Sequence, residues 1–583
     1  MAAKICNWKL VALSISLNMR ARFSRMIRCS IIFFCVFPVI AGLLSVFLPA
    51  FGWFPIYGKS KFTFEILAQT INQAGYFRSV WLSVFTALLS TSLSYWLCIF
   101  TLIYSQKLSL HSKLKKIIAP LIAVPHITIA IGILFLIQPS GWLIRIFSPW
   151  LTGWQTPPDL NIAPDLYGLS LAIGLTAKEL PFLLLVGFTV LKQVNISRYR
   201  EQIASFGYGP ISGWFHIIHP MIAARMRLSV LIVLCFSVSV VDMALILGPS
   251  TPAPMAVKIF SWYQSPDINS QMIAASGAVY LLLIALCCCV FWTVCGAGFK
   301  MVFRFLSYRG ARLTVRSLPH KLIILHLLVS IMFVLTIGLM GLLSAGIWAF
   351  VEVWSFPDVL PQKWGFIFWR DGFSAYINPF INTLFVGSIT SILALISAII
   401  WLEYPSKSFL KFTEAFVYIP LLLPQTGFLF GMQVLIMWLK VEGLHITVIW
   451  AHYLFVFPYI LLTLGPIWRR FDVRYELLGA SFGFSKFERL WRIKIPLMAV
   501  PIITSFTIGF AVSSALYLPT IFAGNGNFLT LTTEAVTLAA GASRQAVGIA
   551  ALLQMILPLV IFLMAGIYIK FWLNGFRYFR ISH

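Results

Sequence analysis

Residues 198–220 read RYREQIASFGYGPISGWFHIIHP, and residues 474–496 read RYELLGASFGFSKFERLWRIKIP. Aligned without a gap, these two segments agree at eight positions, whereas unrelated sequences would agree at roughly one or two. The shared pairs are Arg198/Arg474, Tyr199/Tyr475, Ala204/Ala480, Ser205/Ser481, Phe206/Phe482, Gly207/Gly483, Ile217/Ile493 and Pro220/Pro496. The stretch is an internal repeat, so the chain is expected to contain two copies of one structural unit.

Each copy predicts two short helices separated by a glycine. Apolar side chains recur at helical spacing before the glycine, at Tyr199, Ile203 and Phe206 in the first copy and at Tyr475, Leu478 and Phe482 in the second. Gly207 and Gly483 stand where the end of a helix favours a residue that tolerates positive φ. The pattern indicates a polar, helical hairpin between membrane spans.

The second helix of each copy carries its own start signal. Pro210 suits the first position of a helix in the first copy, and Ser485 with Glu488 forms an S-x-x-E capping box in the second. Pro220 and Pro496 end the motif and lead into long apolar segments.

This pattern resembles the EAA loop of the permease subunits of binding-protein-dependent ABC importers. In that loop a small or acidic start and alanines precede a glycine, and a proline follows at a fixed interval, which both copies keep from Gly207 to Pro220 and from Gly483 to Pro496. The acidic residue differs in place, since Glu201 precedes its glycine by six positions and Glu476 by seven. In the family the loop docks into a cleft on a cytoplasmic ATPase. The resemblance therefore implies a coupling role for Arg198, Glu201, Ala204, Gly207, Pro220, Arg474, Glu476, Ala480, Gly483 and Pro496.

Composition excludes an ordinary soluble domain. Of the 583 residues, 60% are hydrophobic and 10% charged, with a mean hydropathy of +0.92. The net charge of +26 could suggest a nucleic-acid partner, but such a partner requires a folded basic domain, and the sequence contains no polar stretch long enough to form one. We therefore expect a polytopic protein of the lipid bilayer without a nucleic-acid partner.

Apolar runs of about 20 residues predict an all-α membrane fold with twelve transmembrane helices. The expected spans are residues 30–50, 79–103, 117–137, 168–191, 228–248, 272–296, 322–346, 380–402, 413–438, 446–467, 501–523 and 547–570. With both termini in the cytoplasm, 33 of the 43 Lys and Arg residues fall inside and nine outside, while Lys178 lies within a span. The positive-inside rule thus predicts a multi-pass protein of the bacterial inner membrane with both termini cytoplasmic.

Further landmarks recur between the halves. Pro181 and Pro458 are separated by almost the same interval as the two repeated loops, whereas the interval from Pro125 to Pro424 is longer. The difference places an insertion in the outside loop 138–167. Its tryptophans fit either an interfacial aromatic belt or part of a surface that receives a binding protein.

The resemblance covers essentially the whole chain and implies two six-helix permease units of the type I importer kind, fused in one chain. The expected divisions are a basic cytoplasmic N-terminus (1–28), a first unit (29–299), a basic cytoplasmic linker (300–321), a second unit (322–573) and a cytoplasmic tail (574–583).

Charged residues inside spans are candidates for function because their burial in a membrane is costly. Lys178, Glu179 and Asp242 lie within the expected fourth and fifth spans, and His126 and His452 lie beside or before prolines in the third and tenth. A structural ion pair or hydrogen bond is the first interpretation. The second is a path for a cationic solute along Glu179, Asp242, His126 and His452. No metal site or cofactor is expected.

ATP hydrolysis is expected on another chain. Residues 52–60 read GWFPIYGKS, but a phosphate-binding P-loop needs four residues between its glycines and here there are five. At the N-terminus, a cleaved signal peptide is the alternative to a first span, but the apolar run from Ile31 is long and lacks a small-residue cleavage site.

Three classes of function can be compared. The resemblance favours the permease subunit of an importer, with two copies of a cytoplasmic ATPase and a periplasmic solute-binding protein as partners, and with thiamine, ferric iron or another small ion as the solute. The alternative is an ion- or proton-coupled secondary transporter of twelve spans, although residues 105–116 lack the Gly and Asp-Arg motif sought there. An intramembrane enzyme is disfavoured because the H-E-x-x-H and G-x-S-x-G motifs are missing.

Overall fold

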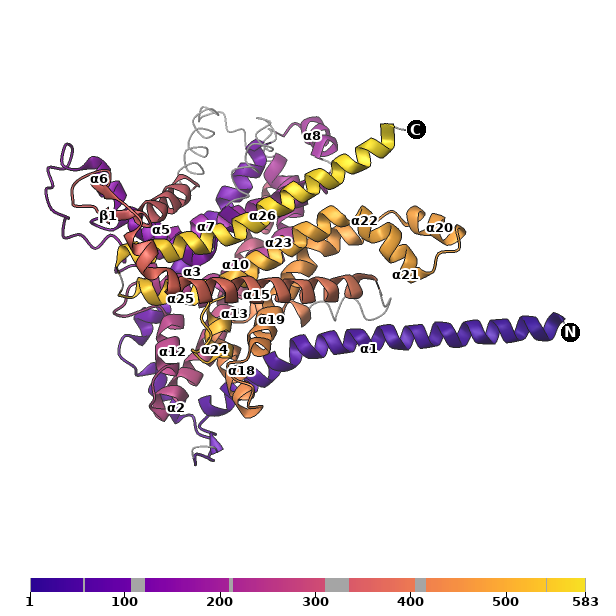
Figure 1. The fold of residues 1–583 in the computed structure, drawn as a ribbon, viewed down its shortest axis with the longest axis horizontal. Coiled ribbons are helices and arrows are strands. Elements are labelled where there is room, and N and C mark those ends of the chain that lie inside the picture. Colours follow the sequence, from indigo (N-terminus) through magenta and orange to yellow (C-terminus); the bar gives the residue numbers. More distant parts are fainter. Residues whose placement is uncertain are drawn as a thin grey trace.

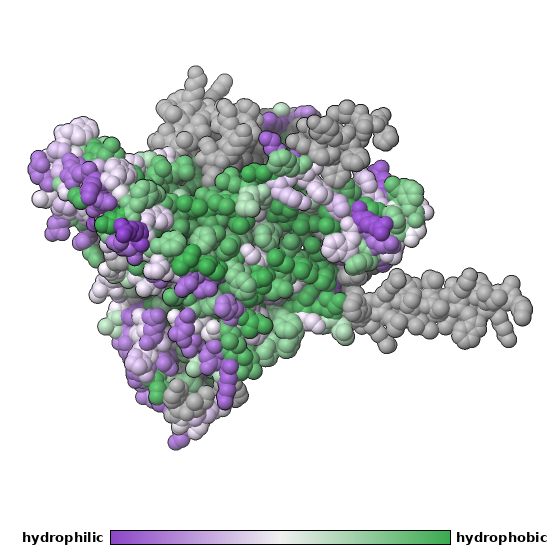
Figure 2. Space-filling view, in the orientation of Figure 1, coloured by the Kyte–Doolittle hydropathy of each residue, from purple (hydrophilic) through white to green (hydrophobic). Residues whose placement is uncertain are grey.

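The computed structural model describes residues 2–55, 58–105, 121–194, 196–208, 213–309, 335–403, 416–541 and 543–581. Within these ranges the chain is helical, with one two-stranded antiparallel sheet formed by β1 (Val351–Val353) and β2 (Lys363–Trp364). Figure 1 shows long helices packed side by side, and Figure 2 shows a broad apolar surface across the middle of the molecule. The expected all-α membrane fold is confirmed.

The helices of the first half are α1 (Ala2–Ala50), α2 (Glu65–Ile71), α3 (Tyr76–Ser105), α5 (His126–Ile137), α6 (Trp142–Phe147), α7 (Leu169–Leu191), α8 (Ile196–Ser205), α10 (His219–Ser239), α11 (Asp242–Leu247), α12 (Met255–Tyr263) and α13 (Ile268–Tyr308). Those of the second half are Leu335–Trp348, α15 (Ile367–Glu403), α17 (Ile419–Leu422), α18 (Thr426–Trp438), α19 (His445–Trp468), α20 (Val473–Ser481), α21 (Lys486–Arg489), α22 (Ile495–Leu497), α23 (Ala499–Ala515), α24 (Leu518–Gly524), α25 (Leu531–Ala539) and α26 (Arg544–Ile581).

Nine of the described helices are long and apolar enough to cross a membrane, or ten if a bent pair counts as one span. The bent pair joins Lys486–Leu497 to Ala499–Ala515 at 77°. The expected seventh and ninth spans are represented by the shorter apolar helices Leu335–Trp348 and Thr426–Met437, and residues 322–334 and 413–415 lie outside the described residues. The expected count of twelve is therefore not confirmed.

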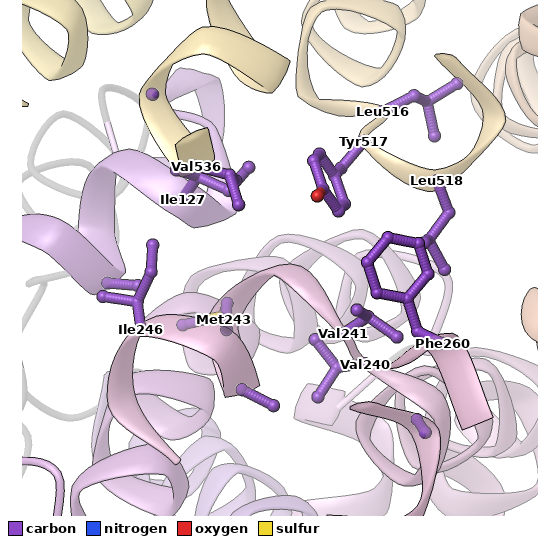
Figure 3. Close-up of a cluster of buried hydrophobic side chains, with 14 of the residues drawn as sticks. Ile127, Val240, Val241, Met243, Ile246, Phe260, Leu516, Tyr517, Leu518 and Val536 are labelled. Atoms are coloured by element: carbon purple, nitrogen blue, oxygen red, sulfur yellow. The ribbon is translucent and has the colours of Figure 1, made fainter. Parts of the chain in front are cut away.

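Two of the expected spans are broken at matching places. The fifth is interrupted at Val240 and Val241, between α10 and α11, and the eleventh at Leu516 and Tyr517, between α23 and α24. The two breaks are as far apart in the sequence as the two copies of the repeated loop. All four side chains are buried, and Figure 3 shows them on opposite sides of one apolar cluster. The breaks of the two halves thus meet in the middle of the molecule.

The first helix of each half packs against a helix of the other half, and glycines allow the close approach. α1 packs against α18, and Cβ atoms built at Gly42 and Gly431 would each lie within 2.3 Å of the opposite backbone. The helix Leu335–Trp348 meets α5 in the same way, since a Cβ on Gly132 would lie 2.6 Å from Gly341. The interval from Gly42 to Gly341 equals that from Gly132 to Gly431. One close helix contact, of the kind that small residues permit in membranes, therefore occurs twice.

One continuous core joins the two halves. A single cluster of buried apolar side chains includes Leu175 and Met243 from the first half and Phe428 and Phe522 from the second. In Figure 1 the hairpin of α20 and α21 and the N-terminus of α1 lie at one end of the long axis, and α6 and β1 lie at the other. The repeated loop of the second half is therefore remote from the inserted loop of the first.

Candidate functional site

Where both are described, the two repeated segments have the same local structure. Gly207 follows α8 with φ +70°, and Gly483 follows α20 with φ +82°, as expected for both glycines. Each segment then contains a π-helical turn, at Trp214–Ile218 in the first copy and Leu490–Lys494 in the second. Since the two turns align with each other when the repeated loops are aligned, the correspondence extends beyond the identical residues.

The start of the second helix is confirmed in one copy. The Ser485 hydroxyl accepts from the backbone N–H of Glu488 at 3.3 Å, and the Glu488 carboxylate accepts from the backbone N–H of Ser485 at 2.9 Å. These hydrogen bonds hold the pKa of Glu488 below its usual value. Pro210 lies outside the described residues. Pro220 and Pro496 each occupy the first turn of the helix that follows.

The apolar side chains of the two loops are exposed to different degrees. Phe482 is 72% exposed, and Tyr475 and Leu478 are also exposed. In the first loop Phe206 is 62% exposed, but Ile203 is only 4% exposed because it packs into a cluster with Trp214. The apolar stripe predicted for the first copy therefore does not lie wholly on the surface.

The expected coupling residues are mostly on the surface. Ala204, Gly207, Ala480 and Gly483 are exposed, as are Arg198 and Glu201. Arg474 lies 3.4 Å from Asp472 in an exposed ion pair. Glu476 differs, because its carboxylate accepts a hydrogen bond of 2.8 Å from Lys494 of the same chain.

Three of the four candidate pathway residues come together within the bundle. His126, the first residue of α5, has its Nε2 3.6 Å from Oε1 of Glu179 on α7. Asp242 begins α11, accepts from the backbone N–H of Met243 at 2.9 Å and lies within electrostatic reach of His126. Figure 3 places Tyr517 of the second half across from Val241 and Met243. The cluster therefore lies where the two broken spans meet.

Two tyrosines of the second half approach these acids. Tyr459 of α19 lies within electrostatic reach of Glu179, and Tyr517 at the break lies within reach of Asp242. Tyr517 is 8% exposed, and none of the hydrogen bonds found among the described residues uses its hydroxyl. The acids come from the first half and the hydroxyl groups from the second.

His452 is not part of this cluster. Its Nδ1 lies 2.8 Å from the Ser513 hydroxyl and its Nε2 2.9 Å from the Thr520 hydroxyl. Because Ser513 precedes the break in the eleventh span and Thr520 follows it, the buried imidazole bridges that break. Lys178 also makes local contacts, donating to the backbone carbonyls of Leu121, Ile122 and Val124.

A buried polar network that sequence reasoning missed links the halves. Gln554 of α26, 1% exposed, accepts from Thr128 of α5 at 2.7 Å and donates to Thr532 of α25 at 2.8 Å. Thr532 in turn donates to the backbone carbonyl of Ser514, next to the break in the eleventh span. In the sequence, this network is indicated only by Gln554 itself, a polar residue within the apolar run of the expected twelfth span.

The inserted loop of the first half lies against the second half. Arg145 of α6 donates to the backbone carbonyls of Ser355 at 2.6 Å and Asp358 at 3.2 Å, and its guanidinium lies over Trp354. Trp142 donates to the carbonyl of Val359 at 3.1 Å. Trp150 remains 71% exposed beyond these contacts.

Comparison with known proteins identifies a relative of similar length. No family model and no solved structure matches the chain. The inner membrane ABC transporter permease protein YnjC of Escherichia coli (strain K12) is 30% identical over 458 residues, which cover 78% of this chain and 81% of YnjC. A match of that length includes residues of both halves. The chain belongs to the inner membrane ABC transporter permeases.

Proposed function

We propose that this chain is the membrane-spanning subunit of a binding-protein-dependent importer, with residues 198–220 and 474–496 as its two ATPase-coupling loops. The observation that carries the proposal is the same helix, glycine and π-turn arrangement found in both loops. Exposed aromatic side chains such as Phe206 and Phe482 are the kind of group that fills a pocket on a partner. Two loops would bind two copies of a separate ATPase.

The proposed orientation follows from the charges. Both termini and both loops lie in the cytoplasm, residues 29–299 and 322–573 form the two permease units, and residues 300–321 join them. The inserted loop 138–167 then lies outside, where a periplasmic solute-binding protein would reach Trp150 and Leu151, which are 71% and 64% exposed. Closure of the ATPases would move the two bundles relative to each other and alternate the access to the path between them.

Purification with the ATPase tests this function. The detergent-solubilised chain should retain a P-loop ATPase at about two copies per chain, and exchange of both Phe206 and Phe482 for Asp should release it. Loss of the ATPase from that variant, while the chain still elutes as a single folded species, supports the proposal. A lone chain that transports solute in proteoliposomes without ATP would establish the secondary-transporter alternative instead.

The solute is proposed to be a small cation, with thiamine and ferric iron as the first candidates to try. Glu179 and Asp242 bring two carboxylates to the meeting point of the two halves, and Lys178 is occupied by backbone carbonyls. Tyr459 and Tyr517 add hydroxyl and aromatic surface from the opposite half, and aromatic faces attract organic cations. A solute held there would contact both halves at once.

Neutralising Asp242 tests the solute class. Asp242→Asn should lower uptake of a cationic solute about tenfold or more, while the ATPase still co-purifies at the wild-type ratio. Ser237→Ala, a buried change on α10 of the same half, is the matched control and should leave uptake near the wild-type value. Unchanged uptake by Asp242→Asn and by Glu179→Gln would exclude a cationic path along these residues.

A further inference from the structure

The second coupling loop is joined to the membrane helices by one buried lysine. Nζ of Lys494 lies 2.8 Å from Oε1 of Glu476 on α20 and 2.8 Å from Oε2 of Glu403 at the end of α15. The same ammonium lies 4.9 Å from the ring of Trp468 at the end of α19 and 5.4 Å from that of Phe471. A single group therefore contacts the coupling helix and two long helices.

Because Lys494 is buried, its contacts with the two carboxylates affect how freely the loop can move. Lys494 is 8% exposed, so its charge is largely removed from water and depends on the two carboxylates for compensation. Within the loop, Arg489 of α21 donates to the backbone carbonyl of Glu476 at 3.1 Å, so α20 and α21 are also held to each other. Displacing α20 without moving α15 would separate the buried ammonium from at least one of its carboxylates, which costs free energy.

The first loop is connected differently. When the two repeated loops are aligned, Ile218 occupies the place of Lys494, and Arg200 occupies the place of Glu476. Contacts to α3 are there made by His219, which lies 3.0 Å from the Tyr95 hydroxyl and stacks on Trp96. The position of Lys494 is thus taken by a neutral side chain in the first loop, and the described contacts of His219 there are to aromatic side chains.

We propose that Lys494 is a positioning residue that transmits movement of the second coupling loop to α15 and α19, and that the two loops are in consequence mechanically unequal. The proposal rests on the coupling function of the loops and deepens it. It also assigns Glu476 an internal role, because its carboxylate serves the chain's own lysine. The ATPase on the second loop would then drive the bundle through this ionic connection, and the ATPase on the first through a loop in which Ile218 stands in place of the lysine.

A cavity beside Lys494, Glu403 and Glu476 leaves room for a larger side chain at position 494. Its volume is about 340 Å³, and it is lined by residues that include Arg28, Trp401 and Arg469 as well as these three. Because the larger guanidinium can occupy this space and still reach both carboxylates, Lys494→Arg should preserve the connection. Lys494→Met keeps an unbranched apolar side chain, one atom shorter, but removes the charge.

The experiment measures solute taken up per ATP hydrolysed by the intact complex in proteoliposomes. Lys494→Met should lower this ratio at least fivefold while ATP hydrolysis continues and the ATPases remain bound, and Lys494→Arg should restore it to within twofold of wild type. Lys258→Met is the matched control, because Lys258 donates to the carbonyl of Ala74 away from both loops. It should leave the ratio unchanged.

Exchanging the charges of Lys494 and Glu476 distinguishes two roles for Glu476: a contact within the chain and a direct contact with the ATPase. The double variant Lys494→Glu with Glu476→Lys recreates an opposite pair and keeps a cation near Glu403, so the ratio should recover at least threefold above that of either single variant. No recovery, together with loss of bound ATPase from Glu476→Lys alone, would overturn the proposal in favour of an ATPase contact. A normal ratio in Lys494→Met would also overturn it. If no ATPase binds the wild-type chain, the coupling function itself fails.

Discussion

At the scale of single residues, the place of a residue in the repeat predicts its backbone conformation but not the contacts of its side chain. Gly207 and Gly483 adopt the positive φ that their sequence position predicts, because that conformation depends on the local end of a helix. The resemblance implies a coupling role for Glu476, and the structure adds that its carboxylate contacts Lys494 of the same chain. The sequence could not show this, since the lysine stands far along the loop and meets Glu476 only after the chain has turned.

Gly483 gives a prediction that depends on backbone conformation alone. A Cβ there would meet no atom within 4 Å, so any cost of substitution comes from its φ of +82°. A β-branched residue in this conformation costs about 1–2 kcal/mol. Gly483→Val should therefore distort the loop and reduce both ATPase retention and uptake several-fold. Gly483→Asn, whose side chain tolerates the left-handed region, is the comparison and should retain most activity. Equal loss in both variants would mean that exposed side-chain volume, and not φ, is what matters.

At the scale of helices, length and hydropathy predicted the segments but not their interruptions. Pro125 and Pro424 marked the third and ninth spans, and the structure breaks the chain at both. The break at Val240–Val241 has no proline or glycine beside it, and residues 234–241 look like part of any continuous span. The break at Leu516–Tyr517 is followed by Pro519, in the first turn of α24. The two breaks face each other across the apolar cluster of Figure 3. Tertiary packing is therefore the remaining explanation for the break at Val240–Val241, whereas Pro519 adds a local cause at Leu516–Tyr517.

The glycine contacts give a prediction for helix packing. On the helix Leu335–Trp348, a Cβ at Gly341 would lie 2.9 Å from backbone of Gly132, whereas one at Gly346 would meet nothing within 4 Å. Gly341→Ala should therefore lower the stability by about 1–3 kcal/mol, as overpacking does, and Gly346→Ala should not. Thermal unfolding of the purified variants measures the difference. A Gly341→Ala protein as stable as Gly346→Ala would show that the two helices separate without cost.

At the scale of the whole molecule, the repeat predicted two related halves but not how they interlock. Residues of both halves share one buried core, and α1 packs on α18 of the opposite half. The sequence contains no sign of that exchange, because Gly42 and Gly431 are ordinary glycines in apolar runs. The same holds for the candidate site, where the sequence does not show which residues of the two halves meet. Glu179 and Asp242 could be recognised as charges within spans, but Tyr459 and Tyr517 could not be recognised as their neighbours.

For the whole molecule, we predict which side of the membrane each loop faces. In a background in which the nine cysteines are replaced, Thr152→Cys in the inserted loop should react with an impermeant maleimide added to intact spheroplasts. Ser485→Cys in the second coupling loop should react only after the membrane is opened. The physical reason is the concentration of Lys and Arg on the side of the loops. The reverse labelling pattern would invert the topology.

The paired glycine contacts have a consequence for assembly. Each half contributes one first helix and one acceptor helix, so two separate polypeptides divided within residues 310–334 would carry complementary surfaces and should find each other when co-produced. Either half would equally accept a second copy of itself, because Gly42 would then meet Gly132. Such a homodimer would have two identical loops, both with Lys494 or both without it. Covalent linkage therefore does more than hold the halves together: it ensures that every transporter receives one loop of each kind.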